Sequence, residues 1–288
     1  MFLHQRMLIE SLAEDLKERI GADTVGVLYL GDLDSFLIAL SASRANKNVT
    51  LYVFELDQQS SDYVVKAYKI ANQLNWSVCK VEIKTEKFLS QIRGILSSLE
   101  LTQKADLMHF FVLAKCLSGP AEGPILSGIG LNILCGLSKE YKSIDTCSSF
   151  LFRSKRLEVL DRDSSLQSIE KLGEELGGVI YAPYLSFRRT TEYFMERDWR
   201  ELNVDGKSGR VMIKVSLRHA CHSRIKERGL VVTQTNAFKA SGLDKLMNEI
   251  LRSKAVNFNS RRRLIELLMD WRLRRMESQR LALKSDSV

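Results

Sequence analysis

Hydrophobic residues recur along the chain with two alternating patterns, one typical of helices and one typical of strands. At the start they return every three or four residues, as in an amphipathic helix, at Met7, Leu8, Leu12, Leu16 and Ile20. Gly21 follows, and we expect it to end this helix in the left-handed conformation that glycine adopts easily. Short runs rich in β-branched residues then alternate with stretches of helical period, and these runs span residues 24–30, 49–55 and 76–83. The alternation of strand and helix predicts a parallel sheet with helices on both faces.

A fourth apolar run, at residues 124–128, follows another helical stretch and is expected to join the same sheet. Beyond residue 140 the pattern is almost wholly helical, with segments predicted at residues 146–160, 164–176, 187–200, 210–228 and 240–252. The predicted fold class is therefore α/β, a parallel-sheet core with a helical C-terminal half. Ligands of such sheets bind beyond the carboxyl ends of the strands, so the turn after Leu30 is the first place to look for a site.

Positive charge gathers at the C-terminal end. The 288 residues include 43 Lys and Arg against 35 Asp and Glu, which gives a formal net charge of +8. From Arg252 onward ten basic residues stand against four acidic ones, a difference of +6. Residues 254–288 are therefore predicted to form a basic amphipathic helix that follows a main domain at residues 1–253.

The basic helix has three interpretations. It packs its apolar stripe on the main domain with its arginines in water, it contacts RNA phosphates, or it docks on a partner protein. No RNA-binding signature of the RNP or GxxG type accompanies it. The residues expected to contact a protein partner or RNA are Arg261, Arg262, Arg263, Trp271, Arg272, Arg274 and Arg275.

The sequence gives no sign of a membrane span or a secretory route. No apolar stretch reaches bilayer-spanning length, and the opening MFLHQRMLIE lacks the order of a signal peptide, so a cytoplasmic protein is expected. Five scattered cysteines, an odd number, are expected to be reduced packing residues. The spacing of His219, Cys221 and His222 does not match a metal-ligand pair, so no metal site is expected there.

The turn after the first predicted strand carries a glycine and an Asp-Ser pair, in the sequence VGVLYLGDLDSF. It resembles the pyrophosphate loop S-G-G-x-D-S of the N-type ATP pyrophosphatases, whose hydroxyl and backbone N–H donors bind phosphate at a helix N-terminus. Gly31, Asp34 and Ser35 match that pattern. Leu30 replaces its first serine and Asp32 its second glycine. If Asp32 points into the loop, its charge opposes an incoming polyphosphate.

Four further stretches extend the resemblance to the synthetase half of asparagine synthetase, from about Val25 to Leu246. In the family's order they are VTLYVFELDQQSSDYVV, ILSGIGLNILCGLSKEY, the segment ending in APYLS, and the segment from KVSLRHACH to NAFKASGLDKL. The resemblance implies an adenine-nucleotide alpha-hydrolase-like core and a magnesium-dependent reaction in which ATP activates an aspartate carboxylate as an acyl-adenylate. The family's glutaminase half has Cys after the initiator Met, where this chain has Phe2, so no glutaminase domain is expected.

The departures from the family fall on groups that its chemistry needs. Three acidic positions of the second loop, a Glu, an Arg and an Asp of the third stretch, and a lysine of the fourth are all replaced. The residues at these positions are Ile129, Asn132, Ile133, Val179, Tyr181, Ser186 and Asn236. Because magnesium needs carboxylate ligands, the resemblance implies a degenerate site with no cofactor, and ATP with Mg²⁺ is expected only if some activity persists.

The residues left for residual nucleotide binding are Gly31, Asp34, Ser35, Ser127, Gly128, Lys214 and Arg218. Structural interpretations compete with this one. Asp34 and Ser35 would cap a helix, Ser127 and Gly128 would form a tight turn, and the two basic residues would form a solvated or ion-paired face.

Three functions remain open. The leading hypothesis is a non-catalytic, asparagine-synthetase-like subunit that supports a protein partner, either a catalytically intact relative or an RNA-containing assembly. The alternative is an active ATP-dependent adenylating ligase or amidotransferase, amide-forming or tRNA-modifying, that takes its missing groups from a partner chain. The third is an RNA-modification accessory, which depends on the basic tail alone.

Overall fold

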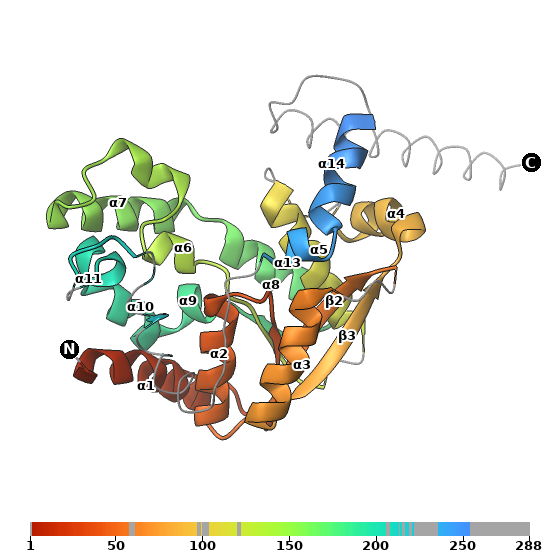
Figure 1. Ribbon diagram of the computed structural model, residues 1–288, viewed down its shortest axis with the longest axis horizontal. Coiled ribbons are helices and arrows are strands. Elements are labelled where there is room, and N and C mark those ends of the chain that lie inside the picture. The colour runs from red at the N-terminus through yellow and green to blue at the C-terminus, as the bar shows by residue number, and fades with distance from the viewer. Residues whose placement is uncertain are drawn as a thin grey trace, which may run out of the picture.

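The computed structural model describes residues 2–57, 61–96, 99, 104–119, 122–205, 208–212, 214, 217–218, 221 and 236–253. Within this part of the chain one sheet is flanked by helices on both faces (Figure 1). None of the helices in it is both long enough and apolar enough to cross a bilayer. The predicted basic helix at residues 254–288 lies outside the described residues, as do its contact residues Arg261, Arg262, Arg263, Trp271, Arg272, Arg274 and Arg275.

Within the described residues the sheet has five strands, all parallel, in the order β3-β2-β1-β4-β5. Their bounds are Thr24–Leu28 (β1), Asn48–Leu56 (β2), Ser77–Ile83 (β3), Ile125–Leu126 (β4) and Ile180–Tyr181 (β5). The α/β class with a parallel core is therefore confirmed. β1 and β4 are shorter than their apolar runs. β5 was not predicted, because two paired residues leave no periodic pattern in a sequence.

Helices connect the strands and fill the C-terminal half. The first five are α1 (Phe2–Arg19), α2 (Leu33–Arg44), α3 (Asp62–Leu74), α4 (Thr85–Leu96) and α5 (Lys104–Leu117). The later ones are α6 (Leu131–Leu134), the 3-10 helix η1 (Lys139–Ser143), α7 (Ser149–Arg162), α8 (Ser165–Leu176), α9 (Pro183–Ser186), α10 (Arg188–Met195), α11 (Trp199–Asn203), α13 (Ala237–Ala240) and α14 (Leu243–Ser253).

Three details of the helix prediction are wrong. Gly21 does not adopt a left-handed conformation, since the chain passes from α1 into β1 without the reversal that such a cap produces. The segment predicted at residues 187–200 is two helices, because Asp198 starts a new one with a capping box to Glu201. The segment predicted at residues 210–228 does not begin as a helix, because Val211 forms an antiparallel bridge with Val204.

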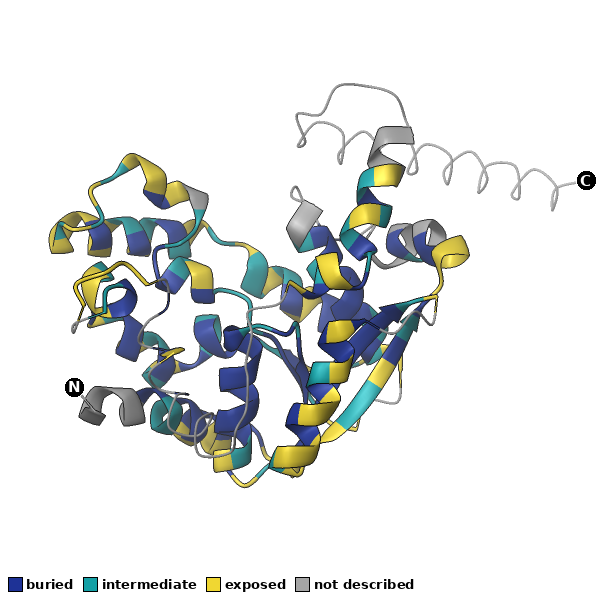
Figure 2. Ribbon diagram, in the orientation of Figure 1, coloured by how far each residue is buried: buried dark blue, intermediate teal, exposed yellow. Residues whose placement is uncertain are grey.

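Helix α2 lies deep in the molecule, between the sheet and α1 (Figure 2). Ten of its twelve residues are buried, among them the polar Asp34, Ser35 and Ser41. Its N-terminus points to the carboxyl ends of the strands. Any group held there is therefore fixed by a rigid part of the core.

Hydrogen bonds fasten α1 to the helical half of the chain. The buried carboxylate of Asp15 accepts bonds from the backbone amide of Thr190, at 2.9 Å, and from its hydroxyl, at 2.8 Å. Arg189 adds ion pairs with Glu18 and Glu14 on α1. The first turn of α10 is thus capped by a residue from the other end of the chain.

The cysteines are free thiols, and most of them lie in the interior. Cys116, Cys135 and Cys221 are buried and Cys79 is half-buried, as expected of packing residues. Cys147 is exposed, so the packing prediction is wrong for that residue. It lies in the turn before α7, where its amide donates to the Asp145 carboxylate at 2.9 Å.

Candidate functional site

The site lies where the strand order reverses. β1 pairs with β2 on one side and with β4 on the other, and chain crossovers leave in opposite directions from this point. Doubly wound sheets bind their ligands in the crevice that such a reversal opens at the carboxyl ends of the strands. The turns after β1 and β4 are therefore the walls of the candidate site, as the sequence predicted for the first of them.

The turn after β1 is closed by its own aspartate. Gly31 takes a left-handed conformation with φ of 70°, which directs the chain into α2. The Asp32 carboxylate then accepts a hydrogen bond from the Ser35 amide at 2.9 Å and one from the Ser35 hydroxyl at 2.5 Å. The predicted cap by Asp34 and Ser35 is wrong, because Asp32 is the N-cap of α2. Its charge occupies the helix N-terminus, where a phosphate would otherwise accept the same bonds.

Asp34 is buried and forms an ion pair with Lys214. Its Oδ2 accepts from the Lys214 ammonium, while its Oδ1 has no hydrogen-bond partner among the described residues. Burial raises the pKa of Asp34 to about 6, the nearby charge of Asp32 adds to the rise, and Lys214 opposes it. The Asp34 carboxylate thus has an ammonium from its own chain as counterion.

Lys214 reaches this pair from a turn in an unusual conformation. Its φ is 57°, in the left-handed region, and its amide donates to Asn203 Oδ1 at 3.0 Å. Its side chain is buried, so the solvated face considered for Lys214 is wrong and the ion-paired interpretation is confirmed. Arg218 follows one turn later, with its amide bonded to the Lys214 carbonyl at 3.0 Å.

The turn after β4 lies against His109 of α5. Ser127 is fully buried, and its Oγ lies 2.8 Å from His109 Nε2 on α5. Desolvation lowers the pKa of His109 to about 4, against the pull of the Asp32 charge, so the ring is neutral at neutral pH. A Cβ on Gly128 would meet Asp34 Cβ at 3.4 Å, which shows how closely the two turns pack.

The remaining two stretches of the family resemblance meet at the same place. The Tyr184 hydroxyl donates to the Asp34 carbonyl at 3.0 Å, and Gly130 leaves room for the side chain of Leu185. The Ala237 amide donates to the Leu30 carbonyl at 3.3 Å. Segments far apart in the sequence therefore converge around the N-terminus of α2.

These residues do not fit magnesium and a polyphosphate. Ile129, Asn132 and Ile133 provide no carboxylate after β4, and the two isoleucines pack against the hydrophobic core. In the part of the chain that the structure describes, no three His, Cys, Asp or Glu side chains come together to hold a metal ion. The Asp32 carboxylate caps α2, and the Asp34 carboxylate binds the Lys214 ammonium through Oδ2.

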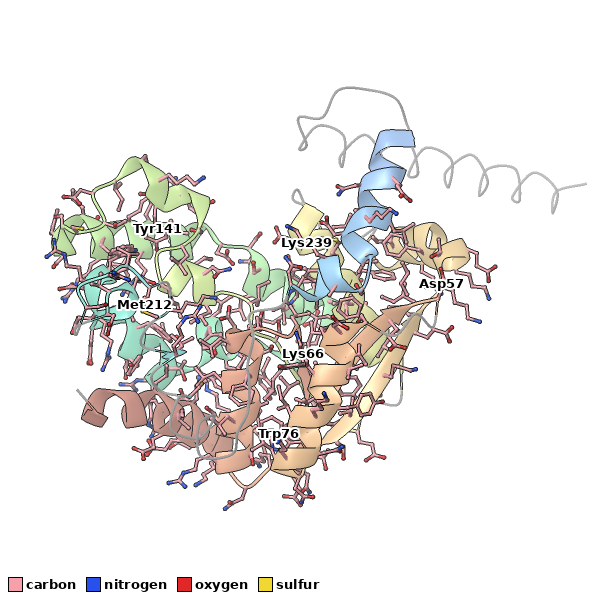
Figure 3. The ribbon with its side chains drawn as sticks, viewed as in Figure 1. Asp57, Lys66, Trp76, Tyr141, Met212 and Lys239 are labelled. Atoms are coloured by element: carbon pink, nitrogen blue, oxygen red, sulfur yellow. The ribbon has the colours of Figure 1, made fainter. Side chains whose placement is uncertain are left out.

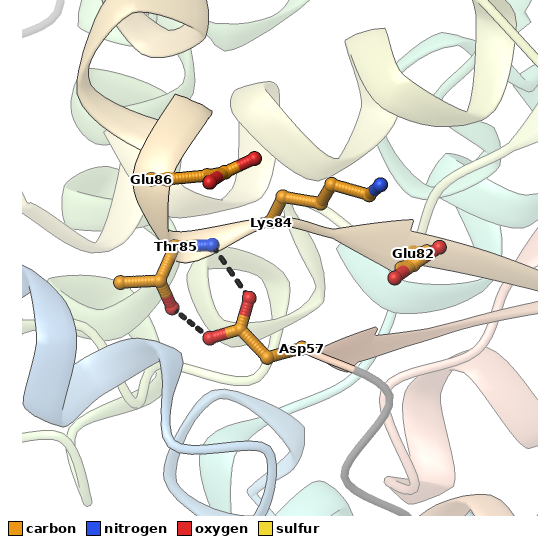
Figure 4. A pocket seen from close by; sticks show the side chains of 5 residues that line it. All are labelled: Asp57, Glu82, Lys84, Thr85 and Glu86. Atoms are coloured by element: carbon orange, nitrogen blue, oxygen red, sulfur yellow. Dashed lines mark hydrogen bonds between the residues drawn. The ribbon is translucent and has the colours of Figure 1, made fainter.

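A hollow of about 510 Å³ lies at the carboxyl ends of β2 and β3 (Figure 4). It is lined by Asp57, Glu82, Lys84, Thr85 and Glu86. The Asp57 carboxylate accepts from the Thr85 amide at 2.8 Å and from the Thr85 hydroxyl, and these bonds hold the pKa of Asp57 below its usual value. The hollow is open and mainly acidic, which disfavours anionic ligands.

No protein-family model and no curated protein matches the chain. Solved structures similar to it include a predicted subunit of a tRNA methyltransferase from Methanocaldococcus jannaschii, at 15% identity and a TM-score of 0.37, covering 74% of this chain and 92% of that one. An NH3-dependent NAD synthetase from Campylobacter jejuni has 14% identity and a TM-score of 0.33, with 68% and 95% covered. An NMN synthetase from Francisella tularensis has 12% identity and a TM-score of 0.33, and the match covers 89% of this chain and 97% of that one.

Proposed function

We propose that this chain is a non-catalytic protein of the N-type ATP pyrophosphatase fold, derived from an asparagine-synthetase-like synthetase domain, and that it acts as a supporting subunit for a protein partner. The single observation that carries the proposal is the position of the Asp32 carboxylate at the N-terminus of α2. The sequence resemblance supports the family, and the converging turns support the location of the former site.

The hydrogen-bond donors that could bind a phosphate at the N-terminus of α2 already have an acceptor within the chain. An isolated helix N-terminus attracts phosphate because its first amides lack acceptors and its dipole is positive. Here Asp32 accepts from Ser35 N and Ser35 Oγ, the two donors that a matching pyrophosphate loop would offer to a ligand. A phosphate would have to displace this carboxylate and would meet its charge at close range.

The carboxylate that could bind a metal ion also has a counterion within the chain. The Asp34 carboxylate, the acidic residue that survives from the family pattern, holds the buried ammonium of Lys214 instead of a metal. The charges of Asp34 and Lys214 balance each other, so this pair needs no bound ion. A scaffold benefits from this arrangement, since the turns stay ordered without a ligand.

Isothermal titration calorimetry on the whole chain tests the proposal, with ATP, ATP plus Mg²⁺, and inorganic pyrophosphate as ligands. We expect no binding by the natural chain. Asp32→Gly frees the first amides of α2 at little structural cost and should create measurable pyrophosphate binding. Asp32→Asn keeps a cap through its amide oxygen and serves as the matched control, which should not bind.

Two results would overturn the proposal. Tight, magnesium-dependent ATP binding by the natural chain, or pyrophosphate release with an amino-acid or tRNA acceptor, would identify an active adenylating ligase. Failure of Asp32→Gly to bind pyrophosphate would show that the Asp32 carboxylate is not what closes the site. Purification of the intact chain with a bound protein partner would support the supporting role directly.

A further inference from the structure

Strand β3 forms one edge of the sheet, and within the described residues no strand pairs with its outer side (Figure 1). It extends from beside Trp76 to the hollow near Asp57 (Figure 3). Its seven residues, SVCKVEI, contain no proline, and its register with β2 is continuous, without a bulge. An edge of this kind presents a row of free N–H and C=O groups that another strand can pair with.

The outward backbone groups are those of the even-numbered residues. The Asp57 amide donates to the Ile83 carbonyl at 2.9 Å, so Ile83 directs its polar groups toward β2. Both polar groups of a strand residue point to one side, and the side alternates along the strand. Val78, Lys80 and Glu82 therefore direct their N–H and C=O groups away from the sheet.

The side chains on one face of this edge include more carboxylates than ammonium groups. Lys80 and Glu82 project from the same face of β3, and Glu82 stands beside Glu55 of β2 in the register. The Lys80 ammonium binds Glu55 Oε2 at 2.9 Å, and its side chain is 46% exposed. Two carboxylates thus share one ammonium on this face, which favours the approach of a second cation at Glu82.

We propose that two copies of this chain join along β3, antiparallel, about a twofold axis at Val81. This register places Lys80 of each copy opposite Glu82 of the other, as directly hydrogen-bonded pairs. An axis at Lys80 would oppose two ammonium groups, and an axis at Glu82 would oppose two carboxylates. An axis at Cys79 would bring no opposite charges together.

The axis at Val81 therefore lets the outward backbone groups of the two copies form hydrogen bonds and places opposite charges beside each other. It joins the two sheets into one of ten strands, five from each copy. β2 separates this surface from β1 and the turn of Asp32, and the inference does not depend on the proposed loss of catalysis. The partner that it fits is a second copy of this chain.

Sedimentation velocity on the whole chain over a range of micromolar concentrations tests the inference. We expect a dimer for the natural chain. Lys80→Glu and Glu82→Lys should each weaken it, raising the dissociation constant about tenfold or more, because each puts like charges opposite one another twice. The double variant Lys80→Glu with Glu82→Lys reverses both charges and should restore the dimer, which separates this effect from damage to the fold.

Cross-linking of engineered cysteines tests the proposed register of the two β3 strands. In a Cys147→Ser background, Val81→Cys should form a disulfide between copies under mild oxidation, since the two residues meet at the axis. Ser77→Cys is the control, because its two copies would lie about 27 Å apart along the strands, at 3.4 Å per residue. A monomer at every concentration, a dimer insensitive to both single charge changes, or equal cross-linking of the two cysteine variants would overturn the inference.

Discussion

The carboxylate of Asp32 accepts a hydrogen bond from the backbone amide of Ser35, 2.9 Å away, in the first turn of α2. The same carboxylate accepts from the Ser35 hydroxyl, which in turn accepts from the Leu30 amide at 3.2 Å. The turn after β1 is therefore a closed set of hydrogen bonds within the chain. Its stability should depend on Asp32 rather than on a ligand.

Replacing Asp32 by alanine should lower the free energy of unfolding by about 1 kcal/mol, the usual effect of losing an N-cap side chain. Asp32→Asn keeps an acceptor for the Ser35 amide and should change stability by much less. Urea denaturation of both variants measures the difference. Equal losses in the two variants would show that the charge, and not the hydrogen bond, stabilises the turn.

The burial of Asp34 predicts a pH-dependent stability. The pKa of Asp34 in the folded chain, about 6, is above its ordinary value of 3.8. Protonation of Asp34 therefore favours folding, and this contribution is complete below about pH 4 and is lost as the pH rises through 6.

Lys214→Met removes the charge that opposes the rise in the Asp34 pKa, so this pKa should rise further. The loss of stability should be small near pH 5 and should grow between pH 6 and 8, by about 1.4 kcal/mol for each unit of added shift. Denaturation curves at several pH values measure it. Lys245→Met, at a side chain that is 82% exposed, is the control and should show no such dependence. A pH-independent loss in Lys214→Met would contradict the prediction.

Arg156 is fully buried, and its guanidinium lies 4.1 Å from the centre of the Phe152 ring. It donates to the carbonyl of Phe194 in the last turn of α10 and, at 3.0 Å, to that of Arg197 just after the helix. Burial lowers the pKa of Arg156 to about 10, so it remains charged at neutral pH.

Arg156→Ala should lower the free energy of unfolding by about 3 kcal/mol or more, because it removes two buried hydrogen bonds and leaves a cavity beside the ring. Chemical denaturation measures the change. Arg162→Ala, on the same helix with a side chain that is 75% exposed, should alter stability by less than about 0.5 kcal/mol. Similar losses in the two variants would argue against the buried hydrogen bonds as the cause.

The basic C-terminal segment remains a prediction from the sequence, and truncation can test it. If it binds RNA, affinity for a mixed-sequence RNA should fall steeply with salt concentration, and a chain that ends at residue 253 should lose it. Filter binding at two or more salt concentrations measures both effects. Equal affinity with and without residues 254–288 would exclude this segment as the RNA contact.

Much of the fold was accessible from the sequence, because hydrophobic period is a local property. The runs around Val27, Leu51 and Val81 are apolar and β-branched, and each is a strand of the parallel sheet. The location of the site was also accessible, since Gly31 and the Asp-Ser pair mark a turn at the carboxyl end of β1. The two-residue β5 and the hairpin bridge at Val211 were missed, because so few residues form no pattern.

The sequence by itself determined the class of fold and the position of the turn after the first strand. Only the tertiary structure decided what the surviving residues do. Asp34 and Lys214 are 180 positions apart, and His109 meets Ser127 across two elements, so no local spacing encodes these contacts. Even Asp32, which the sequence placed in the loop, could oppose a ligand or cap a helix. Burial and hydrogen-bond geometry, which exist only in the folded chain, made it the cap.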